Sequence, residues 1–232
     1  MKMLVRAVLA ALALAGTPGP AAAADLGGLT FAVPEGYEPV AELSRDGHPV
    51  FGRPGARAAL ADVPAARKLD RASIESFIPM DYRAVLQIHV FDLVPPGGDA
   101  AGAGAAETAG MDAAATMPDV ADGSAETLHR RLCDGFRQAW GPNFVADAFD
   151  PATGIGTCVN FAGAFVATYD RRIGDKLIMV ETLDVVDHLA IQKEIGRDFL
   201  ARDTAGKLDF LAGAANRADA TALLASARPA AE

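Results

Sequence analysis

Side chains that carry chemistry are scarce in this sequence, which has only two Cys and four His among its 232 residues. It contains no G-x-S-x-G elbow for a nucleophilic serine, no phosphate-binding loop ending in G-K-[ST] and no H-E-x-x-H zinc helix. Its glycine-rich stretch lacks the preceding strand and following helix of a dinucleotide-binding loop. We therefore expect no cofactor and no metal.

Basic residues are also few, since 21 Lys and Arg stand against 30 Asp and Glu, which gives a formal charge of −9. An acidic surface repels nucleic acid and anionic lipid. No stretch of about 20 apolar residues, the length needed to cross a bilayer, is present. We therefore expect no nucleic-acid partner and no stable membrane insertion. The partner that remains is an unknown protein or a small ligand.

The first 24 residues have the order of a secretory signal peptide. Lys2 and Arg6 precede a short apolar run over residues 7–15, and a small-x-small site ends at Ala24. This pattern predicts cleavage after Ala24, with an uncleaved anchor as the alternative, and a periplasmic or secreted protein. Removing Lys2 and Arg6 leaves 19 basic against 30 acidic residues, so the mature chain has a formal charge of −11.

Both cysteines, Cys133 and Cys158, lie in the mature part of the chain. Export places them in an oxidising compartment, where disulfides form and persist. Cys133 falls next to Leu132 in an expected helix, and Cys158 falls near the start of an expected strand that should pack on that helix. We predict a disulfide between them. The alternative is two buried thiols that act as small apolar side chains.

The largest supply of core residues lies between 156 and 186. Two apolar, β-branched and aromatic runs flank a polar turn that contains Gly174 and Asp175. This arrangement is typical of an antiparallel hairpin. Along each run the apolar residues share one parity, which places them on one side of the strand: Val159, Phe161, Phe165 and Tyr169 in the first run, and Leu177, Met179, Leu183 and Val185 in the second.

The remaining elements precede and follow this hairpin. Alternation predicts strands over 29–33, 37–43, 48–51 and 83–94, and apolar spacing predicts helices over 71–78, 125–140 and 188–201. An irregular bridge joins the helix over 125–140 to the hairpin. This order predicts an α+β fold, in which helices pack on an antiparallel sheet. Residues 25–94 and 125–212 form one domain, interrupted by a flexible insertion over 95–124 that is rich in Ala and Gly. Residues 213–232 form an Ala-rich tail that frays or makes a marginal surface helix.

The segment from Phe31 to Tyr37 reads F-A-V-P-E-G-Y. It resembles the opening of PsbP-like domains, where an F-x-V-P-x-G-aromatic segment forms the first strand and turn. The order of the later elements is compatible with that fold. The resemblance covers seven residues, and it implies a noncatalytic accessory or binding domain.

Among the histidines, His89 lies in the middle of the strand over 83–94. Asp92 points to the opposite face of a regular strand, so the two are not a natural pair. His89 is either hydrogen-bonded across the sheet or part of a ligand site. His48 is expected in a surface loop, and His129 on the polar side of its helix.

A second group, Asp184, Asp187 and His188, could hold a metal through carboxylate and imidazole ligands. Capping of the following helix by Asp187 accounts for the same residues, and we favour that interpretation.

The sequence as a whole predicts an exported, noncatalytic α+β binding domain. The alternative is an exported, hydrolase-like enzyme whose site is assembled around His89 from dispersed residues.

Overall fold

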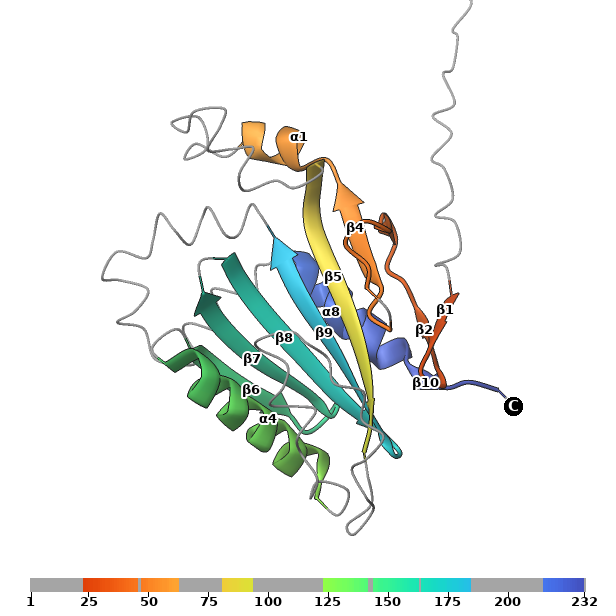
Figure 1. The fold of residues 1–232 in the computed structure, drawn as a ribbon, viewed down its shortest axis with the longest axis vertical. Helices are drawn as coiled ribbons and strands as arrows, with labels where there is room; N and C mark the ends of the chain where they lie inside the picture. Colours follow the sequence, from red (N-terminus) through yellow and green to blue (C-terminus); the bar gives the residue numbers. More distant parts are fainter. Residues whose placement is uncertain are drawn as a thin grey trace, which may run out of the picture.

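The computed structural model describes residues 23–62 apart from 46, residues 81–93, residues 123–184 apart from 142, 143 and 163, and residues 215–231. Within these ranges the chain forms a seven-stranded antiparallel sheet and a smaller three-stranded sheet, with helices packed on them (Figure 1). The predicted α+β class, with helices on an antiparallel sheet, is confirmed. No helix in the described ranges has both the length and the apolar character needed to cross a membrane.

The large sheet has the strand order β3-β4-β5-β9-β8-β7-β6. Its strands, in chain order, are β3 (Glu38–Pro39), β4 (Val50–Pro54), β5 (Tyr82–Asp92), β6 (Phe144–Asp150), β7 (Ile155–Ala162), β8 (Ala164–Ile173) and β9 (Lys176–Asp184). The small sheet contains β1 (Ala23–Leu26), β2 (Leu29–Ala32) and β10 (Arg228–Pro229), and a short helix α1 (Ala56–Ala61) follows β4.

Both faces of the large sheet are covered by helices. Along β9, Ile178 and Val180 belong to a core cluster that includes residues of α8 (Ala215–Ser226), whereas Met179 packs with residues of α4 (Ala125–Trp140). Alternate residues of a strand point to opposite faces, so α4 and α8 lie on opposite sides of the sheet. Figure 1 shows this arrangement, with α4 over β6, β7 and β8.

Several predicted strands are confirmed with altered limits. β2 buries Leu29 and Phe31, as the alternation predicts. The strand expected over 37–43 is only Glu38–Pro39, because the backbone of Ser44 donates to the carbonyl of Val40 and turns the chain away. The weak strand expected over 48–51 begins at Val50. β5 follows its predicted range closely and lies inside the sheet, between β4 and β9.

The predicted hairpin contains one more reversal than expected. Its second half is correct, because β8 and β9 pair around Gly174, whose φ of 61° lies in the left-handed region. Its first run is two strands, since β7 pairs with β8 in a register that places Phe161 opposite Phe165. Phe161 and Phe165 lie on the same face of the sheet in either case, as residues four apart in one long strand or as opposite residues in two paired strands. The alternation therefore did not reveal the reversal between them. The bridge before the hairpin is also a strand, β6.

The C-terminal tail forms a helix, which is one of its two predicted alternatives, but this helix packs in the core rather than marginally on the surface. Residues 215–226 form α8, and its Ala220, Leu223 and Leu224 have no exposed surface. The backbone of Ala32 in β2 also donates to Ser226 Oγ at 2.9 Å. Tyr37, at the end of the segment over residues 31–37, donates a hydrogen bond of 3.1 Å to Asp219 of the same helix. Burial, followed by the nearby Asp219 carboxylate, raises the pKa of Tyr37.

Some predictions lie outside the described residues: the helices over 71–78 and 188–201, residues 1–22 of the signal peptide, and the insertion up to residue 122. β1 includes Ala23 and Ala24, the last two residues of the predicted leader, and its pairs Asp25–Thr30 and Leu26–Leu29 lie after the predicted cleavage point. Cleavage after Ala24 stays a prediction.

The N-terminus of α4 is capped by Ser124, whose side chain accepts a hydrogen bond from the Thr127 backbone N–H. Replacing Ser124 with Ala leaves that N–H without its cap, and we expect the free energy of unfolding to fall by about 1 kcal/mol. Urea unfolding followed by circular dichroism measures the change. Ser124→Asp, which keeps an oxygen acceptor, is the control and should retain most of the stability. Equal losses in both variants would contradict the capping role.

Candidate functional site

The buried face of α4 is wider than the helical stripe predicted for it. Leu128, Leu132 and Phe136 are buried as expected, and His129 and Cys133 are buried beside them, each 1% exposed. His129 precedes Cys133 by four residues, so both point the same way. The prediction that His129 lies on the polar side of the helix is therefore wrong.

His129 forms a buried pair with Asp170 of β8. Its Nδ1 donates to Asp170 Oδ1 at 2.7 Å, and the Asp170 residue is only 2% exposed. The ring of Phe149 lies 5.7 Å from the imidazole, between centroids. A carboxylate away from water needs a charged or hydrogen-bonding partner, and His129 supplies it.

Gly156 of β7 makes room for this pair. A Cβ atom at this position would overlap His129 Nδ1 and would lie 2.6 Å from Asp170 Oδ1. In the strand register Gly156 stands between Phe149 on β6 and Asp170 on β8. The absence of a side chain at 156 thus allows a helix residue and a strand residue to meet over the sheet.

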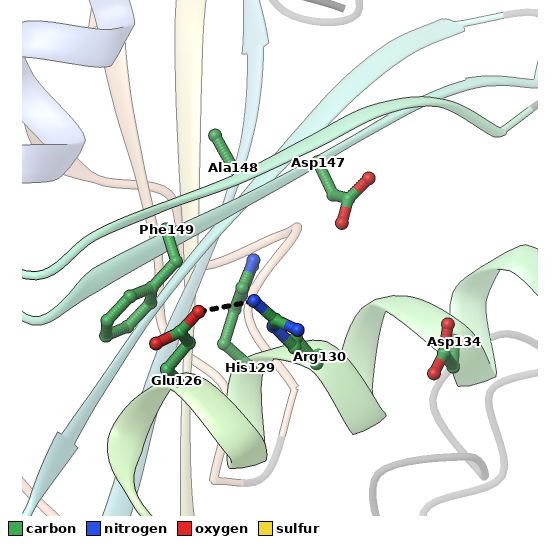
Figure 2. A pocket seen from close by; sticks show the side chains of 7 residues that line it. All are labelled: Glu126, His129, Arg130, Asp134, Asp147, Ala148 and Phe149. Atoms are coloured by element: carbon green, nitrogen blue, oxygen red, sulfur yellow. Dashed lines mark hydrogen bonds and ion pairs between the residues drawn. The ribbon is translucent and has the colours of Figure 1, made fainter.

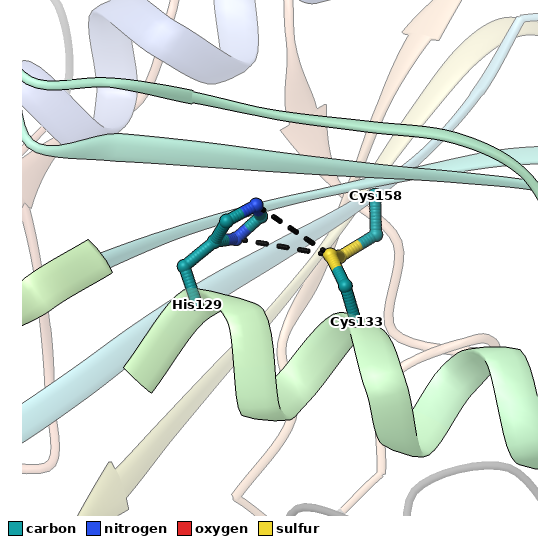
Figure 3. Close-up of side chains that lie close together, drawn as sticks. All are labelled: His129, Cys133 and Cys158. Carbon is teal, nitrogen blue, oxygen red and sulfur yellow. Dashed lines mark hydrogen bonds between the residues drawn. A yellow bond between two sulfur atoms is a disulfide. The ribbon is translucent and has the colours of Figure 1, made fainter. Parts of the chain in front are cut away.

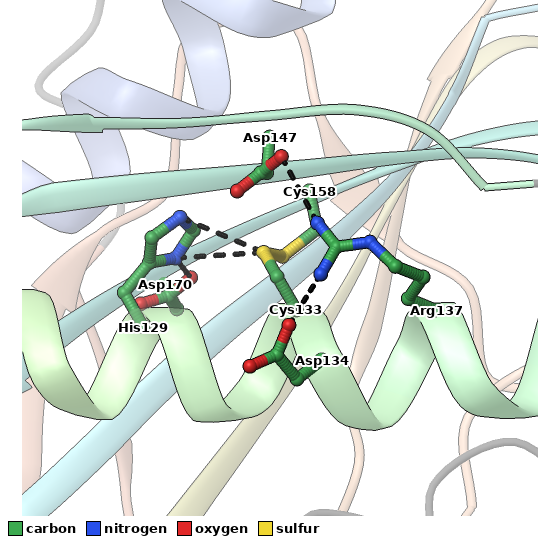
Figure 4. Close-up of a disulfide and its surroundings, with 7 residues drawn as sticks. All are labelled: His129, Cys133, Asp134, Arg137, Asp147, Cys158 and Asp170. Carbon is green, nitrogen blue, oxygen red and sulfur yellow. Dashed lines mark hydrogen bonds and ion pairs between the residues drawn. A yellow bond between two sulfur atoms is a disulfide. The ribbon is translucent and has the colours of Figure 1, made fainter.

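The predicted disulfide between Cys133 and Cys158 is present, and their Cα atoms lie 5.8 Å apart. It joins α4 to β7 beneath the helix (Figure 3). Both ring nitrogens of His129 lie close to Cys133 Sγ, Nε2 at 3.5 Å and Nδ1 at 3.8 Å. The buried His–Asp pair and the disulfide therefore form one contiguous cluster (Figure 4).

A cavity of about 480 Å³ opens between α4 and the edge strand β6, as Figure 2 shows. His129 lies at its inner end, while charged side chains of the helix and the strand line the rest. The lining residues are Glu126, His129, Arg130, Asp134, Asp147, Ala148 and Phe149. None of these lining residues carries a hydroxyl or a thiol.

The charged groups at this cavity are organised by two arginines. Arg130 donates to Glu126 at 2.6 Å, one helical turn away. Arg137 donates to Asp134 and, at 3.3 Å, to Asp147 across the cavity rim (Figure 4). These side chains are largely exposed, so each ion pair contributes little to stability, but together they fix where the carboxylates stand.

His89, the ligand-site candidate of the sequence, lies elsewhere on the sheet. It is fully buried on β5, with Nδ1 2.8 Å from Nδ1 of His48 and Nε2 3.8 Å from Glu181. His48 is therefore a hydrogen-bond partner rather than a free loop residue. Burial, followed by the neighbouring His89, lowers the pKa of His48. His89 is not among the residues that line the cavity beside α4.

The possible metal group Asp184, Asp187 and His188 is described only in part. Asp184 is 3% exposed and lies 3.9 Å from Arg83 Nε, whereas Asp187 and His188 fall outside the described residues.

Sequence reasoning missed the pairing of His129 with Asp170. One sequence signal for this pairing is the four-residue spacing from His129 to Cys133, which places both residues on the same face of the helix. Because Cys133 is predicted to bond to a strand of the sheet, that face points toward the sheet.

Comparisons with known proteins identify no relative: no protein-family model, no curated protein and no solved structure matches the chain.

Proposed function

We propose that this protein is an exported, noncatalytic binding domain that holds a small cationic ligand in the cavity between α4 and β6. The observation that carries the proposal is the cavity itself, about 480 Å³ in volume and lined mainly by charged side chains. This volume falls in the range of small-molecule sites in proteins. The PsbP-like resemblance of residues 31–37 favours the same class of accessory or binding domain.

The charges at the cavity indicate the sign of the ligand. Three carboxylates, from Glu126, Asp134 and Asp147, line it against the guanidinium of Arg130, and Arg137 stands at the rim, so that the carboxylates outnumber the guanidiniums by one. The chain as a whole is also acidic. Phe149 adds an aromatic face, on which an apolar group or a cation can rest. A small amine with an attached ring matches this lining.

A binding role accounts for the polar groups better than a catalytic one. The carboxylates are already paired with Arg130 and Arg137, and the lining offers no hydroxyl or thiol as a nucleophile. His129 Nδ1 is occupied by Asp170, and the ring rests against a disulfide sulfur. The disulfide is compatible with the oxidising compartment that export implies.

The test compares two probes of similar size and opposite charge, phenethylamine and phenylacetate, by isothermal titration calorimetry and by NMR shifts of the α4 and β6 amides. We expect the amine to bind and the acid not to bind. Asp147→Asn should weaken amine binding, whereas Asp175→Asn, in the exposed β8–β9 turn, should not. Equal binding of both probes, or equal effects of the two substitutions, would contradict the proposal.

An exported, hydrolase-like enzyme is the second candidate, and the contact between His89 and Glu181 favours it. An imidazole held beside a carboxylate can act as a general base. Hydrolysis of p-nitrophenyl acetate by the wild type, lost in His89→Gln, would support this alternative. Esterase activity that is absent, or that is unchanged in His89→Gln, would remove it.

A further inference from the structure

We propose that reduction of the disulfide converts the cluster beneath α4 into a zinc site, with Cys133 Sγ, Cys158 Sγ and His129 Nε2 as ligands. These three residues offer one nitrogen and two sulfurs within 4.8 Å of one another, and all three are buried. Two thiolates and an imidazole are ligands that Zn²⁺ prefers. This site shares His129 with the lining of the cavity, but it does not depend on the amine-binding role proposed above.

The spacing of the ligand atoms suits the metal. A tetrahedral Zn²⁺ with bonds of about 2.3 Å to sulfur and about 2.0 Å to nitrogen holds those two atoms about 3.5 Å apart. The structure places His129 Nε2 and Cys133 Sγ at 3.5 Å. Once the S–S bond is broken, the two sulfurs separate by side-chain rotation, and a small turn of the imidazole aims the Nε2 lone pair at the metal.

Asp170 prepares His129 for this role. Its carboxylate accepts the Nδ1–H bond at 2.7 Å, which leaves Nε2 as the nitrogen without a proton. Zinc-binding histidines commonly donate their second N–H to a carboxylate in this way, which fixes the ring and raises its basicity. The buried His–Asp pair, which the amine-binding role does not use, thereby gains a function.

The net charge of the cluster and its access from solvent are also compatible with a bound Zn²⁺ ion. Two thiolates balance the two positive charges of Zn²⁺, so that the buried cluster carries no net charge beyond that of Asp170. Three protein ligands leave a fourth position for water. His129 lines the cavity beside α4, and that cavity supplies the route by which a water molecule and the ion enter.

The conversion needs a reductant, which we identify as a dithiol. Two thiol–disulfide exchanges transfer two electrons to the Cys133–Cys158 bond, yielding two protein thiols and the oxidised, disulfide form of the dithiol. Zn²⁺ then displaces the two thiol protons, and neutral His129 contributes its Nε2 lone pair without losing a proton. Exchange with the disulfide form of the dithiol reverses the process: it takes two electrons from the two thiolates, re-forms the Cys133–Cys158 bond, regenerates the dithiol and releases the ion, because the disulfide sulfurs are no longer thiolate ligands.

The experiment titrates Co²⁺, a spectroscopic substitute for Zn²⁺, into full-length protein that was reduced under denaturing conditions and refolded without oxygen. We expect one equivalent to bind with sulfur-to-cobalt charge-transfer absorption, and Zn²⁺ to displace it. The oxidised protein should show no such absorption. Circular dichroism on each sample records whether the fold is retained.

Variants assign the ligands. Asp170→Asn should weaken Co²⁺ binding by about 10- to 100-fold, and His129→Gln, which removes a ligand itself, should weaken it by more than that. Arg131→Gln, at an exposed position of the same helix outside the cavity lining, is the matched control and should bind Co²⁺ normally. Reduced wild type that binds no Co²⁺, whether folded or unfolded, overturns the proposal, as does full affinity in His129→Gln.

Discussion

Replacing His129 with Ala is expected to lower the free energy of unfolding by about 3–5 kcal/mol, the size of loss that follows when the partner of a buried charged group is removed. Asp170, which is 2% exposed, would lose the imidazole hydrogen-bond donor that lies 2.7 Å away. The substitution also leaves an empty volume beside the disulfide, which adds to the loss.

A double-mutant cycle separates the energy of the interaction between His129 and Asp170 from the cost of the empty volume that His129→Ala leaves. Asp170→Ala should also destabilise, and the His129→Ala/Asp170→Ala variant should lose less than the sum of the two single changes, because no uncompensated charge remains. Chemical unfolding at neutral pH measures all four proteins. Arg130→Ala, which breaks only an exposed pair with Glu126, is the control and should cost less than about 1 kcal/mol. Additive losses in the cycle would contradict the proposed pairing.

The contrast between His129 and the predicted helix over 125–140 shows what the sequence can and cannot establish. The helix limits and the Ser124 cap follow from local chemistry, namely apolar spacing and a side-chain acceptor before the first turn. The partner of His129 is 41 residues further along the chain. The two meet only because Gly156, on an intervening strand, has no side chain. No local pattern contains that information.

The prediction that the C-terminal tail frays or lies on the surface was wrong for a different reason. Ala220, Leu223 and Leu224 follow the i, i+3, i+4 spacing of a buried helical face, so the signal was present in the sequence. The high Ala content around them masked it, because small side chains bury little surface each. Composition alone does not show which surface α8 packs against. The face of the sheet beneath α8 is apolar, with Ile178 and Val180 fully buried.

The extra reversal between β7 and β8 is hidden for a geometric reason. Two antiparallel strands that pair as β7 and β8 do keep the same alternation of inward residues, so one long apolar run and two paired short ones look alike. Gly174 marked the second turn clearly because a left-handed residue was needed there. The predicted fold class is correct despite this error, since one long strand and two paired strands both give an antiparallel sheet.

Removing the disulfide is expected to lower the free energy of unfolding by about 3.5 kcal/mol, from the chain entropy that a closed loop of this length takes from the unfolded state. Cys133 and Cys158 are 25 residues apart, and the loop between them includes the end of α4 and all of β6. Their pairing was predictable, unlike that of His129 with Asp170, because no other cysteine competes. For a domain of this size the loss corresponds to a fall in Tm of roughly 7–14 °C.

Calorimetry on oxidised wild type, reduced wild type and the Cys133→Ala/Cys158→Ala variant tests this expectation, with a chelator present so that no metal replaces the lost cross-link. Reduced wild type and the double variant should both melt well below the oxidised protein. The double variant is also the control for the reductant, because adding the reductant to it should change nothing. Since the disulfide links α4 to β7, amide exchange should rise first in α4 when the bond is absent. Equal melting of the oxidised and reduced wild type would show that packing of Leu132 and Phe136 alone holds the helix in place.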